Sequence, residues 1–207
     1  MDKKYVALTF DDGPNNVVTP LVLDALEKYS IPATFMLVGR NIKDDVKDVM
    51  QRQKALGCEF ANHGFNHLHM TALSSDERKA EIEKTQNLVE KYTGCIPKVF
   101  RPPYIDVDED LLKSTGLIPV CGLGCSDWDK NVDKDRTASE MIKNTRPGHI
   151  MLLHDSDYNA KTAYALDDII PALKSKGYEF VTVSELFKLY KVTPVAGKMY
   201  TNVLEDN

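Results

Sequence analysis

The stretch Val6-Ala7-Leu8-Thr9-Phe10-Asp11-Asp12-Gly13-Pro14 decides the fold class of this chain. An apolar run of this length that ends at a glycine and a proline predicts a buried strand of an α/β protein. Two carboxylates follow at its carboxyl end, where such folds place their chemistry. Because adjacent carboxylates repel one another, a bound cation is the usual means of keeping both ionised. The alternative is an acidic pair that precedes a helix beginning near residue 17.

Strand and helix signals alternate along the rest of the chain. Apolar runs predict strands, and apolar residues at spacings of three and four predict the helices between them. We expect strands at residues 5–10, 33–38, 58–62, 98–100, 118–121, 149–153 and 179–182, and helices at 19–29, 44–56, 75–92, 108–114, 138–144, 162–176 and 184–190. About seven such units are too many for a small open sheet, so the sequence predicts an α/β fold of the (β/α) barrel type. Residues 1–207 are expected to form a single catalytic domain, with a core over about residues 5–190 and an irregular tail over 191–207.

Size and composition are those of an ordinary soluble globular protein of 207 residues. The net charge of −5 offers no basic surface for nucleic acid, and no apolar stretch is long enough to span a bilayer. The first residues lead directly into the first strand, so no secretory signal is visible. Two interpretations stay open: a cytoplasmic protein, or a domain cut from a longer exported or anchored protein, which would act outside the cell or in the cell envelope.

The cysteines show neither the spacing of a zinc clip nor the density of a disulfide framework. They are Cys58, Cys95, Cys121 and Cys125. We expect mostly buried thiols that behave as small hydrophobic side chains.

Three of the five histidines lie within seven residues, at His63, His67 and His69. A spacing of four lets His63 and His67 face one metal if the segment takes a helical turn. One carboxylate and two imidazoles would leave an open coordination position, as a hydrolytic metal site requires. His69 is treated as a neighbour of this pair. For any one histidine alone, the alternative is an ordinary solvated side chain.

Three further segments follow expected strands or contain unusual side chains. In Arg101-Pro102-Pro103-Tyr104 the prolines fix the backbone, and Tyr104 is the first residue after them with an N–H that can stabilise an oxyanion. Asp127 precedes Trp128, the only tryptophan of the chain. The strand expected at 149–153 ends in His154, a good position for acid–base chemistry.

Taken together, five segments resemble the ordered motifs of the polysaccharide deacetylases, the NodB-like group of carbohydrate esterase family four. They are TFDDGP at 9–14, HGFNH at 63–67, RPPY at 101–104, SDW at 126–128 and LLHD at 152–155. Each motif is weak alone, but five in order make a strong signal, and the match covers about residues 5–190. The likeness is greatest to clostridial-type members, among them acetyl xylan esterases and peptidoglycan N-acetylglucosamine deacetylases. It implies the single-domain, distorted (β/α) barrel of that family.

The resemblance implies a division of labour between the two acids. Asp12, His63 and His67 would hold one divalent metal, zinc in first place and cobalt in second. Asp11 would be the general base, kept ionised and oriented by Arg101. The metal would polarise the acetyl carbonyl and lower the pKa of the attacking water.

The same resemblance gives roles to the remaining motif residues. The backbone N–H of Tyr104 would stabilise the oxyanion. His154 would protonate the leaving amine or alcohol, with Asp127 holding its ring. Trp128 and Leu152 would wall the pocket for the acetyl methyl group.

The chain departs from the family pattern at three positions outside these roles. Gly64 stands where the family usually has serine or threonine, whose hydroxyl steadies the loop. Ile105 stands where many members have glycine, and Gly124 where an acid is often found. We expect a modest effect on metal affinity from the first and on the shape of the groove from the second.

The expected function is that of a metal-dependent hydrolase, acting as a monomer on an acetylated polysaccharide. N-deacetylation of N-acetylglucosamine in peptidoglycan is favoured, and O-deacetylation of acetylated xylan or deacetylation of chitin oligomers are the alternatives. A silent carbohydrate-binding module on the same fold would have lost Asp11 or His154, and both are present. A phospho-acceptor receiver would need a shorter chain with a lysine at a late strand end, and it would not explain RPPY or the paired histidines.

Overall fold

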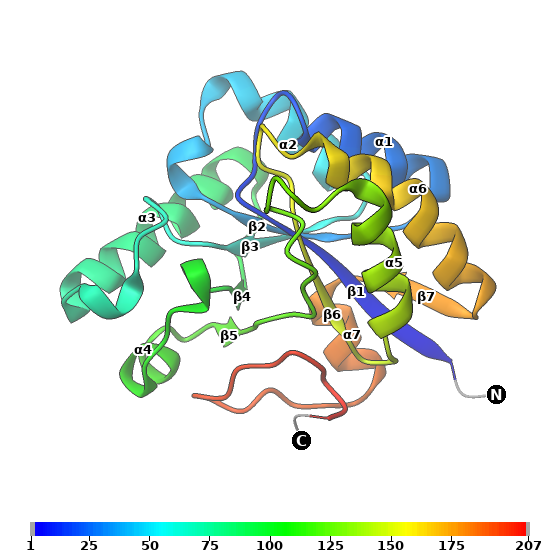
Figure 1. Cartoon of the computed structure of the whole chain (residues 1–207). Coiled ribbons are helices and arrows are strands. Elements are labelled where there is room, and N and C mark those ends of the chain that lie inside the picture. Colours follow the sequence, from blue (N-terminus) through cyan, green and yellow to red (C-terminus); the bar gives the residue numbers. More distant parts are fainter. Residues whose placement is uncertain (1–2, 206–207) are drawn as a thin grey trace.

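The strand quoted above is β1 (Lys4–Asp11), and it lies inside a seven-stranded sheet in the computed structural model, which describes residues 3–205 (Figure 1). The other strands are β2 (Thr34–Leu37), β3 (Glu59–Asn62), β4 (Val99–Phe100), β5 (Ile118–Pro119), β6 (Ile150–His154) and β7 (Tyr178–Val181). The helices are α1 (Thr19–Tyr29), α2 (Lys47–Ala55), α3 (Ser75–Thr93), α4 (Glu109–Ser114), α5 (Lys134–Asn144), α6 (Ala160–Ser175) and α7 (Val183–Leu189). Short 3₁₀ turns are η1 (Gly39–Asn41), η2 (Asp44–Val46), η3 (Met70–Ala72) and η4 (Pro103–Ile105).

The sheet is parallel and curls until its two ends meet. The strand order is β5-β4-β3-β2-β1-β6, and β7 pairs with the first half of β1. After β5, Leu123 forms a parallel bridge with Met151 of β6. The N–H of Leu123 donates to the carbonyl of Ile150 (2.7 Å), and its carbonyl accepts from the N–H of Leu152 (2.8 Å). One residue therefore closes the sheet, and the predicted distorted (β/α) barrel is confirmed.

Alternation along the strands separates an outer from an inner face of the sheet. On β1, the outer side chains of Leu8 and Phe10 belong to the large core shared with α1, α2 and α6. Ala7 belongs to a second, smaller core, which fills one end of the barrel. Thr9 and Asp11 share the inner face with Ala7 but lie further along the strand. The inner face is therefore apolar at one end and polar at the other.

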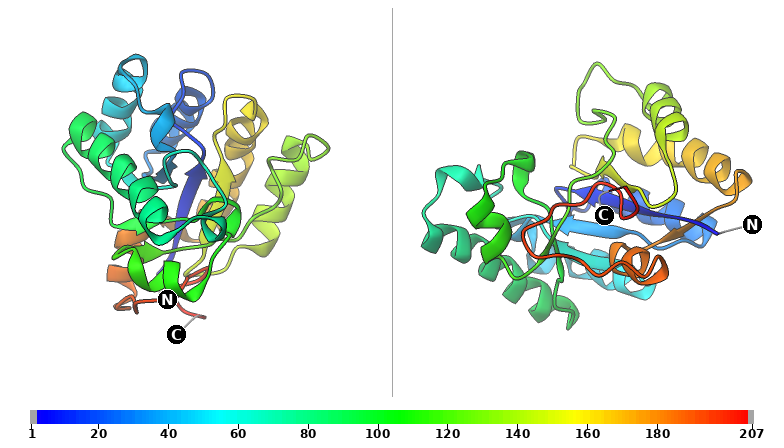
Figure 2. Two further views of the ribbon diagram at one scale, coloured as in Figure 1. Left: turned by 90° about the vertical axis from the view of Figure 1, so that its left-hand side faces the viewer. Right: turned by 90° about the horizontal axis from the view of Figure 1, so that it is seen from below.

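The C-terminal tail covers the apolar end of the barrel, away from the loops that follow the strands' carboxyl ends (Figures 1 and 2). Tyr200 and Val203 are fully buried members of the smaller core. Tyr200 pairs with Val120, and its N–H donates to the carbonyl of Pro119 (3.2 Å). Residues 191–205 are thus irregular in conformation but packed against the barrel.

Helix α5 differs most from its predicted bounds within residues 3–205. It begins at Lys134, before the expected residue 138, because Asp133 caps it by accepting from the N–H of Arg136 (2.8 Å). The expected helix 44–56 is divided into η2 and α2.

The cysteines are free thiols, two buried and two half-buried. Burial raises the pKa of Cys58 to about 11 and that of Cys125 to about 12, so neither thiol is a reactive nucleophile. Among the described helices, none has the length and apolar character needed to cross a membrane.

Candidate active site

The carboxyl ends of β1, β3, β4 and β6 meet at the polar end of the barrel. The pairing register places Asp11 directly opposite His154 and Asn62 opposite Phe100. His63 and Arg101, each one residue further, are therefore neighbours as well. A cleft of about 1110 Å³ opens above these strand ends. Of the predicted site residues, those that line it are Asp11, Asp12, His63, His67, Tyr104, Asp127, Trp128, Leu152 and His154.

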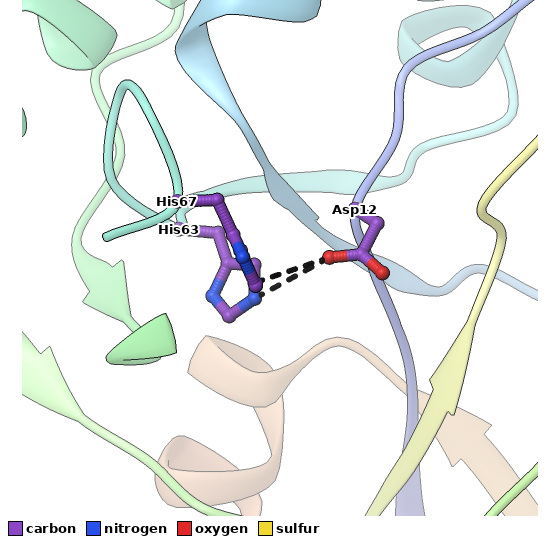
Figure 3. Close-up of side chains that lie close together, drawn as sticks. All are labelled: Asp12, His63 and His67. Carbon is purple, nitrogen blue, oxygen red and sulfur yellow. Dashed lines mark ion pairs between the residues drawn. The ribbon is translucent and has the colours of Figure 1, made fainter. Parts of the chain in front are cut away.

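Asp12, His63 and His67 form a cluster with the geometry of a metal site (Figure 3). The Oδ1 atom of Asp12 lies 3.4 Å from His67 Nε2 and 3.8 Å from His63 Nε2, and the three ligand atoms all lie within 4.8 Å of one another. Ligands of a tetrahedral ion at bonds of 2.0–2.2 Å are separated by about 3.4 Å. One carboxylate oxygen and two imidazole nitrogens therefore fit a single divalent ion after a small inward movement.

The two histidines lie on a loop, so they come together without the helical turn that their spacing also allows. Gly64 and His67 have φ angles of +74° and +58°, which bend the segment back on itself. Glu81 of α3 holds this loop by accepting from the backbone N–H groups of residues 65 and 66 (2.9 and 2.6 Å). The side chain of Asn62 accepts from the N–H of Gly64 (2.9 Å). These bonds steady the loop although residue 64 carries no hydroxyl.

Hydrogen bonds and burial prepare the cluster for a cation. His63 Nδ1 lies 2.6 Å from the carbonyl oxygen of Arg101, which can only accept a hydrogen bond, so Nδ1 carries a proton and Nε2 is the nitrogen that faces Asp12. Burial, together with the nearby His63, lowers the pKa of His67 to about 4, so its imidazole is neutral at neutral pH. Ser156 Oγ donates to Asp12 Oδ2 (2.7 Å) and leaves Oδ1 for the ion. Burial opposes ionisation of Asp12, but His63 and the Ser156 hydrogen bond outweigh it and lower the pKa.

Asp11 is tied by a buried ion pair to Arg101. The Nη1 atom of Arg101 lies 2.5 Å from Asp11 Oδ1 and also donates to Thr9 Oγ1 (2.8 Å). The Nε of Arg101 donates to the carbonyl of Cys121 (3.0 Å), so the guanidinium is fixed inside the barrel. The other oxygen of Asp11, Oδ2, lies 3.7 Å from His63 Nε2. One oxygen of Asp11 is thus engaged by Arg101, and the other lies beside the metal cluster.

Asp127 and His154 form a second buried pair. His154 Nδ1 lies 2.8 Å from Asp127 Oδ1. Asp127 Oδ2 accepts from the N–H of His154 (2.8 Å), from Thr162 Oγ1 (2.7 Å) and from Asn159 Nδ2 (3.2 Å). Burial lowers the pKa of His154, but the hydrogen bond and charge of Asp127, with smaller contributions from Asp11 and Asp12, raise it to about 9. At neutral pH His154 is therefore an imidazolium that can donate a proton.

Aromatic side chains flank the cluster. Tyr104 follows the two prolines with a φ of +59°, and its ring centroid lies 4.5 Å from that of His67. His69 stacks on the ring of Tyr104 with a centroid distance of 4.1 Å, outside the cluster formed by Asp12, His63 and His67. Trp128 is largely exposed and Leu152 half-buried. Ile105 and Gly124, two of the departures from the family pattern, also line the cleft.

Several residues that support the site received no role from the sequence, among them Glu81 and Asn159 described above. Besides Ser156 and Thr162, the fully buried Asp155 accepts from the N–H of Gly13 (3.0 Å) and from Thr19 Oγ1 (2.6 Å). Burial raises the pKa of Asp155 to about 7, against the effect of the Thr19 hydrogen bond. This carboxyl group fixes the turn that carries Asp12. In the sequence, the one indication of a role for Asp155 is its position at the end of the LLHD motif.

Known proteins resemble this chain over nearly its whole length. A family model described as polysaccharide deacetylase matches residues 1–120. A bifunctional xylanase/deacetylase of Pseudobutyrivibrio xylanivorans is 39% identical over 98% of this chain, which spans 34% of that relative. A peptidoglycan-N-acetylglucosamine deacetylase of Bacillus cereus is 34% identical over 92% of this chain and 70% of the relative. The chain thus corresponds to about a third of the first relative and to most of the second.

Solved structures with the same fold match even more closely in length. The Xyl-CE4 domain of a multidomain xylanase from the hindgut metagenome of Trinervitermes trinervoides superposes with a TM-score of 0.96 and 38% identity, over 98% of this chain and 99% of that one. A family 4 acetyl xylan esterase from Clostridium thermocellum, in complex with a cobalt ion, gives 0.94 and 42%, over 97% and 99%. The peptidoglycan deacetylase PdaC from Bacillus subtilis gives 0.85 and 34%, over 92% and 93%.

Proposed function

Because this chain belongs to the polysaccharide deacetylase family, we propose that residues 1–207 form one catalytic domain that removes acetyl groups from a polysaccharide with the help of a divalent metal. The observation that carries the proposal is the register of β1 and β6. It places Asp11 opposite His154, beside the cluster of Asp12, His63 and His67. A candidate base, a candidate acid and a candidate metal site therefore line the same cleft.

The metal would be held by Asp12 Oδ1 and by the Nε2 atoms of His63 and His67. We propose zinc as the physiological ion and cobalt as a substitute, because imidazole and carboxylate ligands suit both and a relative's structure contains cobalt. Three protein ligands leave a position open for the substrate. When bound, the ion supplies a Lewis acid for hydrolysis.

Asp11 would take the proton from the attacking water. Its Oδ1 is occupied by Arg101, so the proton would go to Oδ2, the oxygen beside the metal cluster. The backbone N–H of Tyr104 would donate to the oxygen of the acetyl carbonyl as negative charge develops there.

His154 would complete the reaction by giving its Nε2 proton to the leaving oxygen or nitrogen. Asp127 orients the ring through Nδ1 and stabilises the imidazolium. Trp128 and Leu152 line the cleft and would enclose the acetyl methyl group.

Two polymers are candidate substrates. The xylan-acting neighbours match this chain over 99% of their own length with TM-scores of 0.96 and 0.94, which favours ester hydrolysis on acetylated xylan. Peptidoglycan deacetylases among the relatives support the amide of N-acetylglucosamine, the substrate favoured by the sequence, as the second candidate. Both polymers lie outside the cell or in the cell envelope, and we propose that the protein acts there as a monomer.

The test is acetate release from acetylated xylan and from an N-acetylglucosamine oligomer, measured side by side before and after chelation. We expect release that stops with chelator and returns with zinc or cobalt. Activity that persists without metal would contradict the mechanism, and no acetate from any polymer would favour a binding module. His154→Ala distinguishes the two leaving groups. The variant should lose release from the N-acetyl amide, because an amine must be protonated to depart, and should keep measurable activity on an activated acetyl ester.

A further inference from the structure

Exposed apolar side chains are concentrated in the cleft. Within residues 3–205, four of the ten exposed large hydrophobic residues line it: Val17, Tyr104, Trp128 and Tyr158. Tyr104 and Trp128 have roles at the acetyl group. Val17 and Tyr158 have none, yet Tyr158 is the most exposed of the ten, at 73%.

Tyr158 is presented by a rigid turn between β6 and α6. Asp155 and Ser156 before it and Asn159 after it are buried, whereas Asp157 and Tyr158 project into solvent. The N–H of Asn159 donates to the carbonyl of Ser156 (2.8 Å), and its side-chain amide donates to the carbonyl of His154 (3.1 Å). Because the turn is already fixed, a ligand that packs on the Tyr158 ring does not have to order the backbone.

Val17 lies on a second loop that is tied to this turn. The side chain of Asn15 accepts from the N–H of Val17 (3.0 Å), and its amide donates to the carbonyl of Asp155 (2.6 Å). The loop after β1 and the loop after β6 also lie side by side at the same end of the barrel (Figures 1 and 2). Both apolar side chains therefore belong to one connected rim of the cleft.

We propose that Tyr158 and Val17 form a sugar-binding subsite for the part of the polysaccharide next to the acetylated residue. A pyranose ring has an apolar C–H face, which packs on an aromatic ring, and a polar edge of hydroxyl groups. Asn16 and Asp157, which also line the cleft, place polar groups beside the two apolar side chains. This inference rests on the proposed function, because it takes a polysaccharide as the ligand.

The short stretch of chain between His154 and Tyr158 limits the distance between this subsite and the reacting acetyl group. Tyr158 is four residues after His154, so the two Cα atoms are separated by at most about 14 Å. A sugar packed on Tyr158 would therefore belong to the same short stretch of polymer as the reacting acetyl group. The subsite would add affinity for oligomers and none for a small acetyl ester.

The test compares Tyr158→Ala with Tyr164→Ala. Tyr164 is a similarly exposed tyrosine on α6 that does not line the cleft. We expect Tyr158→Ala to lower kcat/KM on acetylated xylo-oligosaccharides about tenfold, mainly through KM, since one face of a phenol ring loses its apolar contact. Tyr158→Phe, which keeps that face, and Tyr164→Ala should behave as the wild type. All variants should keep the wild-type rate on 4-nitrophenyl acetate.

Calorimetric titration with xylohexaose, which carries no acetyl group, separates the two proposals. Tyr158→Ala should weaken this binding about tenfold, whether or not the protein is catalytic. A change of less than twofold in oligosaccharide binding and kcat/KM would overturn the subsite, and so would an equal loss on the small ester. If the wild type hydrolyses no acetyl substrate but the binding difference persists, the proposed function fails and the subsite stands.

Discussion

Replacing Asp127 by asparagine should remove the acid function of His154 while leaving the metal cluster in place. Three donors converge on Asp127 Oδ2, and only His154 Nδ1 faces Oδ1. The asparagine should therefore turn its carbonyl oxygen to the three donors and its NH₂ group to the ring. Nδ1 must then accept a hydrogen bond, which fixes a neutral imidazole with its proton on Nε2.

The magnitude follows from the pKa of His154, which Asp127 helps to raise from 6.5 to about 9. Without that carboxylate, burial is opposed only by Asp11 and Asp12, and the pKa should fall to its ordinary value or lower. At pH 8 a group with a pKa of about 9 is roughly 90% protonated, and one at 6.5 is roughly 3% protonated, a loss of about thirtyfold. Because the acid must be protonated, activity is present below the pKa and lost as the pH rises through it. A bound divalent cation would lower the pKa of His154 in the wild type and in Asp127→Asn alike. The prediction therefore concerns the difference between these two pKa values.

The assay is the pH profile of kcat/KM on an N-acetylglucosamine oligomer and on 4-nitrophenyl acetate, whose leaving group departs without a proton. Asp127→Asn should shift the alkaline limb to lower pH on the first substrate and lower its rate at pH 8 about thirtyfold, with a much smaller loss on the second. Asp129→Asn is the matched control, because the carboxylate of Asp129 bonds Asn131 on the same loop. An unchanged alkaline limb, or equal losses on both substrates with normal metal content, would refute the reasoning.

Three further variants test the other parts of the site. Asp11→Asn should retain the metal by elemental analysis and lose most turnover, and an empty site would show that the two acids have been assigned wrongly. Arg101→Met leaves Asp11 buried without its partner and should lower the free energy of unfolding in urea by about 3–5 kcal/mol; a loss below about 1 kcal/mol would mean that the pair adds little. Ser156→Ala removes the 2.7 Å hydrogen bond to Asp12 Oδ2 and should weaken zinc affinity by about 10–100-fold in a chelator competition, whereas unchanged affinity would show that Asp12 needs no such support.

The sequence predicts those parts of the fold that depend on local patterns. The bounds of α1 agree with the expected helix, because its apolar spacing and proline are local signals. The start of α5 was missed because it depends on the Asp133 cap in a charged stretch without apolar periodicity. Closure of the barrel by Leu123 could not be foreseen, because that residue meets Met151 only in the folded chain.

In the candidate site, too, local sequence patterns predict some features, and contacts between distant segments determine the others. The motif residues proposed to carry the chemistry are recognisable in the sequence, and the fold brings Asp12, His63 and His67 together. Their loop conformation was not foreseen, because a spacing of four is compatible with a helical turn and with a tight loop. The supporting bonds of Ser156 and Asp155 join segments more than 130 residues apart, and no local pattern records such contacts.

Anomalous scattering from a crystal grown with zinc would test the central claim most directly. We expect one strong peak bonded to Asp12 Oδ1 and to the Nε2 atoms of His63 and His67 at about 2.0–2.2 Å, with Asp11 Oδ1 still paired to Arg101. A peak bonded to Asp11 in place of Asp12, or a zinc ion held outside this cluster, would contradict the account.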